Sequence, residues 1–264
     1  MSDAQKALDD AYENGGFIPR ADTYPPKWEA DAAAFRAAVA CKLDIPYGAG
    51  ARAQYDLFYP AQEAKGLFVF VHGGYWKARS KSDWSHFAGG AIEHGFDAAL
   101  IGYPLAPEAR ISQITQCISA GITVAAAQVD GPIRLAGHSA GGHLVARMAM
   151  PGVLPEVVAR RVDRIMPISP LSDLRPLLDL SMNEILQLDP AEAVAESPVL
   201  GGKRDHIAMN TIVGSQERPA FLDQNRWLAE AWGIEEMILP GRHHFDVIDG
   251  LAAGDTPVMR WLMA

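Results

Sequence analysis

Residues 137–141, Gly-His-Ser-Ala-Gly, carry the pattern of a nucleophilic serine. They follow the apolar run Ile133–Ala136 and precede the helix-like run Gly142–Met150, so the motif lies in a strand–turn–helix context. The small residues two positions before and after Ser139 permit a sharp turn that lifts the hydroxyl to the carboxyl end of a sheet. The alternative is a glycine-rich turn without chemistry, and the context favours the nucleophile.

A glycine-rich loop upstream, His72–Trp76, could stabilise the negative charge that develops on a carbonyl oxygen during acyl transfer. Removing one fixed N–H donor aimed at such an oxygen costs about 10²–10³ in rate. The N–H groups of Gly74 and Tyr75 are candidate donors, and Gly73 shapes the loop. Ala140, directly after the serine, supplies a further N–H. The glycine-rich loop and the turn at Ser139 both follow apolar runs, so we expect them at the same end of one sheet.

An acid and a base should follow later strands of the same sheet, in the chain order nucleophile, acid, histidine. Glu217 follows a late apolar run and is the candidate acid, with Asp223 and Asp246 as alternative carboxylates. Two adjacent histidines, His243 and His244, follow the last apolar run, and their spacing alone does not choose between them. In such a site the acid orients the imidazole, which takes the proton of the serine.

The elements that must position these residues alternate along the chain. Apolar runs separated by helix-length segments from residue 66 onward predict an α/β fold with a parallel sheet covered on both faces. Two earlier β-like runs predict an antiparallel edge. We expect one domain over 1–264, with a helical N-terminal extension at 1–40. The expected strands are 42–46, 53–59, 66–71, 98–102, 133–136, 164–168, 208–213 and 236–239, and the expected helices include 82–94, 112–129, 140–150 and 219–232.

The composition excludes several classes of protein. The 264 residues are 49% hydrophobic and 21% charged, as in a globular chain rather than a disordered one. The net charge of −9 argues against a nucleic-acid partner, which favours a basic face. No apolar run is long enough to span a membrane and Met1–Lys6 lacks a leader pattern, so we expect a cytoplasmic protein without a membrane partner.

We expect no metal and no cofactor. The side chains of adjacent histidines do not project to the same side of the chain, as those at positions i and i+4 of a helix do when they bind one metal ion. The chain also has no His-Glu-x-x-His or Cys-x-x-Cys motif. The two cysteines, Cys41 and Cys117, are expected to be free thiols, since a pair does not make a disulfide framework at this size.

With these pieces placed, the chain resembles the α/β-hydrolase superfamily. Within it, the chain is similar to the kynurenine formamidase (arylformamidase) group, near the hormone-sensitive-lipase-like esterases, from about residue 43 to 250. The motifs that carry the resemblance are His72–Trp76, the segments Tyr103–Pro107 and Ile111–Gln116, the turn Gly137–Gly142, and His244–Asp246. The resemblance implies an α/β-hydrolase fold with a mostly parallel central sheet and a small cap inserted at 171–204, between late strands. It selects His244, because the histidine before Phe is catalytic in the group, whereas Glu217 stands where the group carries Asp.

The resemblance also implies a reaction. A serine hydrolase of this group would convert N-formylkynurenine to kynurenine and formate through an acyl-enzyme on Ser139, and Tyr75, Trp76 and Trp84 would line an aromatic pocket. A carboxylesterase or thioesterase acting on other small acyl groups is the alternative, since fold and triad do not choose a substrate. A non-catalytic binding module on the same fold is a remote alternative, against which the intact set of serine, acid and histidine argues. The expected partner is a small ester or formamide, and the oligomeric state, monomer or homodimer, stays open.

Overall fold

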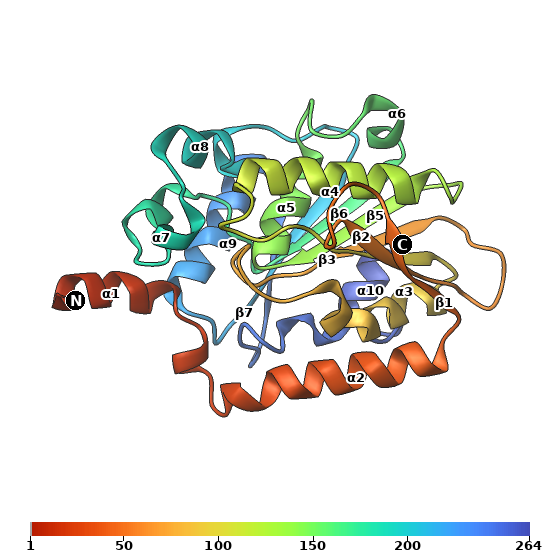
Figure 1. Ribbon diagram of the computed structural model, residues 1–264, viewed down its shortest axis with the longest axis horizontal. Helices are drawn as coiled ribbons and strands as arrows, with labels where there is room; N and C mark the ends of the chain where they lie inside the picture. The colour runs from red at the N-terminus through yellow and green to blue at the C-terminus, as the bar shows by residue number, and fades with distance from the viewer. Residues whose placement is uncertain (1) are drawn as a thin grey trace.

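An eight-stranded sheet forms the centre of the computed structural model, which describes residues 2–264 (Figure 1). The strand order is β1-β2-β4-β3-β5-β6-β7-β8. β2 pairs antiparallel with both of its neighbours, and all the remaining pairs are parallel, which confirms the predicted mostly parallel sheet. The strands are β1 (Cys41–Pro46), β2 (Gln54–Phe58), β3 (Leu67–Val71), β4 (Asp97–Ile101), β5 (Ile133–His138), β6 (Val162–Ile168), β7 (Ala208–Gly214) and β8 (Glu235–Leu239).

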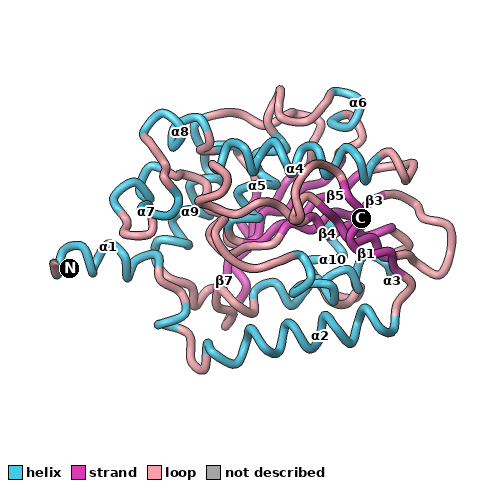
Figure 2. Tube along the Cα trace, viewed as in Figure 1, coloured by secondary structure: helices cyan, strands magenta, loops and turns pink. Residues whose placement is uncertain are grey.

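Helices cover both faces of the sheet, as the alternation of runs predicted (Figures 1 and 2). α4 and α5 contribute buried side chains to the core on one face, and α2, α3 and α10 contribute to the core on the other. The helices are α1 (Asp3–Tyr12), α2 (Tyr24–Ala38), α3 (Gly89–Glu93), α4 (Ile111–Ala126), α5 (Ala140–Ala149), α6 (Glu156–Ala159), α7 (Asn183–Leu186), α8 (Pro190–Ala195), α9 (Pro219–Trp232) and α10 (Pro257–Leu262).

Strand β3 explains why the run 66–71 is apolar throughout. Leu67 and Val69 point into the core beside α4 and α5, whereas Phe68 and Phe70 point into the core beside α2 and α10. All five residues of the strand are buried. Because both faces of a parallel sheet are covered by helices, no position of such a strand faces water.

The N-terminal extension contains two separate helices. Ser2 caps α1, since its side chain accepts the N–H of Gln5 at 3.1 Å. α1 points away from the body of the molecule, and short 3₁₀ turns return the chain to α2, which runs beneath the sheet (Figure 1). α2 packs there against a 3₁₀ helix at Lys81–Ala88, so the start of the chain lies close to the loop after β3. Across residues 2–264, none of the helices combines the length and the apolar character that crossing a membrane requires.

Candidate active site

Ser139 lies in a strained turn between β5 and α5. Its φ of 57° and ψ of −117° fall in a region that residues with a side chain rarely adopt. A Cβ atom at Gly137 would overlap the carbonyl oxygen of Gly141, and one at Gly141 would overlap the carbonyl oxygen of Val71 in β3. The N–H of Ser139 donates to the carbonyl of Ile168 at 2.8 Å. The turn is thus held between two strands, and only glycine fits on either side of the serine.

The glycine-rich loop after β3 packs directly against this turn. A Cβ atom at Gly73 would lie 3.0 Å from the Cβ atom of Ser139, so a glycine is needed for this approach. Gly74 and Tyr75 both adopt positive φ, 109° and 49°. In the turns and loops of residues 2–264, neither the Gly74 N–H nor the Tyr75 N–H donates to a backbone carbonyl. Ala140 is the first residue of α5, where backbone N–H groups have no partner within the helix.

A buried carboxylate and imidazole meet at the same end of the sheet. Oε2 of Glu217, after β7, lies 2.6 Å from Nδ1 of His244, after β8. The other oxygen of Glu217, Oε1, accepts the N–H of Gly214 at 2.8 Å and the hydroxyl of Ser169 at 2.5 Å. Because an ionised carboxylate only accepts hydrogen bonds, Nδ1 of His244 carries the proton and Nε2 is left as an acceptor.

Two rings hold the imidazole of His244 in place. The ring of Phe221 lies 4.3 Å from it and the ring of His138 lies 4.6 Å from it, centroid to centroid. Burial disfavours a charge on His138 and a charged His244 would repel it, so its pKa is held well below the ordinary value for histidine. His138 is therefore a neutral neighbour of the imidazole.

The alternative candidates for the acid and the base form contacts with residues outside the Glu217–His244 pair. Nε2 of His243 lies 3.0 Å from the hydroxyl of Tyr24. Asp246 accepts the backbone N–H of His243 at 2.7 Å. Asp223 pairs with Arg226 on the exposed face of α9. The structure thus separates the two adjacent histidines by their partners, which the spacing in the sequence could not do.

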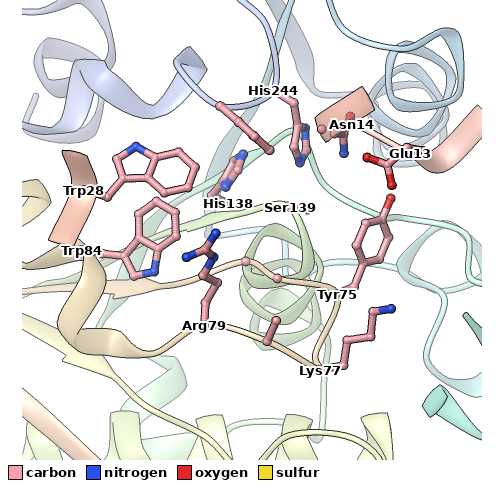
Figure 3. Close-up of a pocket in the computed structure, with 15 residues that line it drawn as sticks. Glu13, Asn14, Trp28, Tyr75, Lys77, Arg79, Trp84, His138, Ser139 and His244 are labelled. Carbon is pink, nitrogen blue, oxygen red and sulfur yellow. The ribbon is translucent and has the colours of Figure 1, made fainter. Parts of the chain in front are cut away.

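A cavity of about 260 Å³ opens beside the serine (Figure 3). Its lining includes the expected Ser139, His244, Gly73, Gly74, Tyr75 and Trp84. Trp76 is not among them: its side chain is fully buried and packs edge-on against the ring of His143 at 5.1 Å. The structure therefore corrects the expectation that Trp76 lines the pocket. In this tight loop the side chain of Tyr75 faces the cavity, whereas the side chain of Trp76 points into the core.

The expected cap also lies elsewhere. The segment 171–204 buries a series of leucines against the core beside α4 and α5, and within the described chain it contributes no residue to the cavity lining. The N-terminal extension covers the cavity instead, through Glu13, Asn14, Gly15 and Trp28. The hydroxyl of Tyr75 donates to the carbonyl of Tyr12 at 2.5 Å, which ties this extension to the loop after β3.

A model of a family described by its α/β-hydrolase fold matches residues 68–225, which is more than half of the chain. The chain belongs to the α/β-hydrolase family. This hydrolase is 29% identical over 238 residues to a kynurenine formamidase of Drosophila melanogaster, covering 83% of this chain and 79% of the relative. It is 25% identical over 236 residues to a kynurenine formamidase of Salmo salar, covering 84% and 80%.

Solved structures of other proteins share the fold of this hydrolase. A candidate thioesterase from Silicibacter sp. TM1040 shares 52% of its sequence and superposes with a TM-score of 0.96, covering 97% of this chain and 99% of that one. A carbohydrate esterase from gut microbiota, in truncated form, superposes with a TM-score of 0.66 at 18% identity, covering 85% and 94%, and this likeness concerns the fold alone.

Several lining residues escaped the sequence interpretation. Lys77 and Arg79 follow the glycine-rich loop so closely that its position alone could have indicated them. Trp28 and Glu13 gave no local signal, because their place at the cavity depends on how the start of the chain crosses the fold. His138, inside the serine turn, both lines the cavity and packs against the ring of His244.

The remaining histidines near the site have structural contacts. Nδ1 of His72 lies 2.7 Å from the carbonyl oxygen of Gly73, its ring stacks on Tyr103 at 4.3 Å, and burial lowers its pKa to about 3. Throughout residues 2–264, no group of three or more His, Cys, Asp or Glu side chains is placed to hold a metal ion.

Proposed function

We propose that this protein is a serine hydrolase that cleaves a small aryl formamide or ester through an acyl-enzyme on Ser139. The observation that carries the proposal is one shared cavity. It is lined by the strained serine, by the loop with free N–H groups, and by a histidine whose far nitrogen is bonded to Glu217. These are the parts that nucleophilic acyl transfer requires: nucleophile, base, orienting acid and oxyanion donors.

The proposed reaction has two halves. Nε2 of His244 takes the hydroxyl proton of Ser139 while Oγ bonds to the formyl carbon, and the N–H groups of Gly74 and Tyr75 receive the oxyanion. The C–N bond then breaks, His244 returns the proton to the leaving nitrogen, and a formyl ester remains on the serine. Water attacks this ester as it gives one proton to His244, that proton passes to Ser139 Oγ as the C–O bond breaks, and the formic acid released loses its remaining proton to solvent as formate.

The shape of the cavity supports an aromatic leaving group. The rings of Trp28 and Trp84 lie 4.7 Å apart, centroid to centroid, and both line the cavity. Its volume of about 260 Å³ is at the small end of ligand pockets, which favours a small acyl group over a long chain. The kynurenine formamidases to which the chain is similar cover more than four-fifths of it, which favours N-formylkynurenine as the first substrate to test.

A small-ester or thioester hydrolase is the second candidate. It is favoured by the 52% identity to the candidate thioesterase, the highest identity among the matches given above. The same serine, histidine and carboxylate would act, and only the leaving group would differ: an alkoxide or thiolate needs less protonation by His244 than an anilide nitrogen does.

Initial rates on N-formylkynurenine, p-nitrophenyl acetate and acetyl-coenzyme A, measured side by side, test both candidates. We expect Ser139→Ala to lower kcat by about 10⁴-fold or more on every substrate that the wild type turns over. Ser181→Ala is the matched control, because it removes a hydroxyl that bonds Asp9 on the surface, away from the cavity. An organophosphate that phosphorylates serine should add one adduct mass to the wild type and none to Ser139→Ala.

The outcomes separate the candidates. A high kcat/KM on the formamide, lost with Ser139, supports the formamidase. Turnover of the ester or thioester alone keeps the mechanism and replaces the substrate. Full activity of Ser139→Ala on any of the three would refute the acyl-enzyme.

A further inference from the structure

The cavity has two sides that differ in chemistry. Trp28, Trp84 and Arg79 lie together on one side of Ser139, and Glu13 and Asn14 lie with Tyr75 on the other (Figure 3). The contacts agree with this view: the guanidinium carbon of Arg79 lies 5.5 Å from the centroid of the Trp28 ring, which in turn packs on Trp84. One side of the cavity therefore combines two large aromatic faces with a positive charge.

The backbone of Arg79 is held in position, and the charge of its guanidinium is only weakly paired with a carboxylate. Its backbone is fixed by a positive φ of 76° and by the guanidinium of Arg52, which donates to its carbonyl oxygen. Within residues 2–264, its one ion pair is with Glu29 at 4.0 Å, at the limit of such contacts, and the Glu29 side chain is 62% exposed. Asp83, the other carboxylate near it, accepts the N–H of Ser80 at 3.2 Å. The N–H groups of Arg79 are thus left for a further acceptor.

Four buried polar atoms in the lining also have no hydrogen-bond partner among the described residues. They are Nε1 of Trp84, Oδ1 of Asn14 and both ring nitrogens of His138, in residues that are only 2%, 7% and 4% exposed. A buried polar group without a partner costs about 1–3 kcal/mol, so such atoms are normally satisfied by water or by a ligand. Their presence in the cavity points to a ligand with polar groups of its own as well as a ring.

We propose that Arg79 is a specificity-determining residue that binds a carboxylate on the leaving group of the substrate. The preferred substrates are then aryl formamides or esters whose ring carries an acidic side chain, with the ring against Trp28 and Trp84. The planar guanidinium suits this role, because it can form two parallel hydrogen bonds with one carboxylate while it stacks on an aromatic face. This inference rests on the proposed function for the identity of the reacting bond, but not for the binding of the anion.

Binding to the Ser139→Ala protein tests the inference without turnover. The probes are 3-phenylpropanoate and its neutral amide, 3-phenylpropanamide, titrated by isothermal calorimetry. We expect the anion to bind about tenfold or more tightly than the amide, and this preference to fall as the ionic strength rises. Equal binding of the two probes, or no binding of either, would overturn the inference even if the hydrolase proposal stands.

Substitution of Arg79 supplies the second arm. Arg79→Gln should remove the preference for the anion, and Arg79→Lys should retain part of it, because lysine keeps the charge but not the planar fork. Arg226→Gln removes an exposed arginine on α9, where it pairs with Asp223, and should leave the preference intact. Lys77→Gln removes the other cation of the lining. If Lys77→Gln abolishes the preference and Arg79→Gln does not, the assignment to Arg79 is wrong.

Turnover supplies a further measurement, the ratio of kcat/KM on an acidic and a neutral ester, which would not change if Arg79 had only a structural role. For phenyl acetate and 3-(4-acetoxyphenyl)propanoate, Arg79→Gln should lower kcat/KM on the acidic ester about tenfold more than on the neutral one. An equal loss on both esters would show that Arg79 only maintains the fold of the loop. Absence of turnover of either ester by the wild type would count against the proposed function, while the calorimetric result would still decide the role of Arg79.

Discussion

Replacing Glu217 by glutamine should switch the proton of His244 to the wrong nitrogen. The carboxylate receives three donors: the Gly214 N–H and the Ser169 hydroxyl on Oε1, and Nδ1–H of His244 on Oε2. Glutamine has one oxygen and one NH₂ group in the same volume. Its oxygen should face the two donors, which leaves the NH₂ group against Nδ1. The imidazole must then accept at Nδ1 and carry its proton on Nε2, where it cannot take the proton of the serine.

The size of the effect follows from this loss of the base. In a serine protease triad, the corresponding change of acid to amide lowers kcat by about 10⁴ through the same tautomer. That factor is equivalent to about 5 kcal/mol of transition-state stabilisation. Because Glu217 and His244 are both buried here, water offers little relief to the misplaced proton. We therefore expect Glu217→Gln to lower kcat on p-nitrophenyl acetate by about 10³–10⁴, with circular dichroism and thermal unfolding to verify the fold.

Glu217→Asp is the matched variant, because it keeps the charge and shortens the side chain by one methylene. The 2.6 Å contact with His244 should open by about 1 Å, and a misplacement of this size can cost about 10²-fold. The aspartate variant should thus be less impaired than the glutamine variant. A Glu217→Gln protein that is folded and retains more than a tenth of the wild-type kcat would refute the tautomer argument.

Three further predictions concern stability. Gly141→Ala should cost more than about 4 kcal/mol or prevent folding, because the new Cβ overlaps the carbonyl oxygen of Val71; recovery of folded protein with an unchanged melting temperature would contradict this. Trp76→Ala should lower the free energy of unfolding, measured in urea, by about 3–5 kcal/mol, because it removes a fully buried side chain. A raised KM without a loss of stability would instead indicate that Trp76 lines the cavity. Burial lowers the pKa of His143 to about 4, below its value of about 6.5 in the unfolded chain, which therefore takes up the proton first as the pH falls. The contribution of His143 to stability should accordingly be complete well above pH 6.5 and be lost by up to about 3 kcal/mol as the pH falls towards 4, in addition to the losses from His72 and His138, whose pKa values burial also lowers. The pH dependence should be flatter in His143→Gln, where the amide can still donate to the carbonyl of Glu196, and parallel curves would exclude a contribution from this histidine.

The local parts of the site were the ones that the sequence could predict. The turn at Ser139 and the loop at Gly73 depend on glycines a few residues apart, and the physics that requires them is the overlap of a Cβ atom with a neighbouring backbone. The strand pattern was equally readable, because β3 is buried on both faces and its run is apolar at every position. All eight expected strands are present, with ends that differ by a few residues at most.

The parts that depend on long-range packing could not be predicted. Trp76 belongs to the same short motif as Tyr75, and nothing in the spacing indicates that the two side chains point to opposite sides of the loop. The cap was expected at 171–204 because the superfamily that the chain resembles inserts caps between late strands, yet the leucines of this segment pack against the core. Trp28 reaches the cavity only because α1 projects outward and the chain then returns, a path set by tertiary contacts rather than by helical periodicity.

The cavity is lined by residues from widely separated parts of the chain. Glu13 and Trp28 come from the start of the sequence, Ser139 from the middle and His244 from near the end, so the site is a contact of very high sequence separation. Contacts of this kind form late, because closing long loops costs entropy before any contact repays it. A chain that has been synthesised only as far as Ser139 lacks His244, and under the proposed mechanism it could not hydrolyse a substrate. During refolding, the return of activity should accordingly lag behind the return of the sheet, which makes turnover a report on the completion of folding.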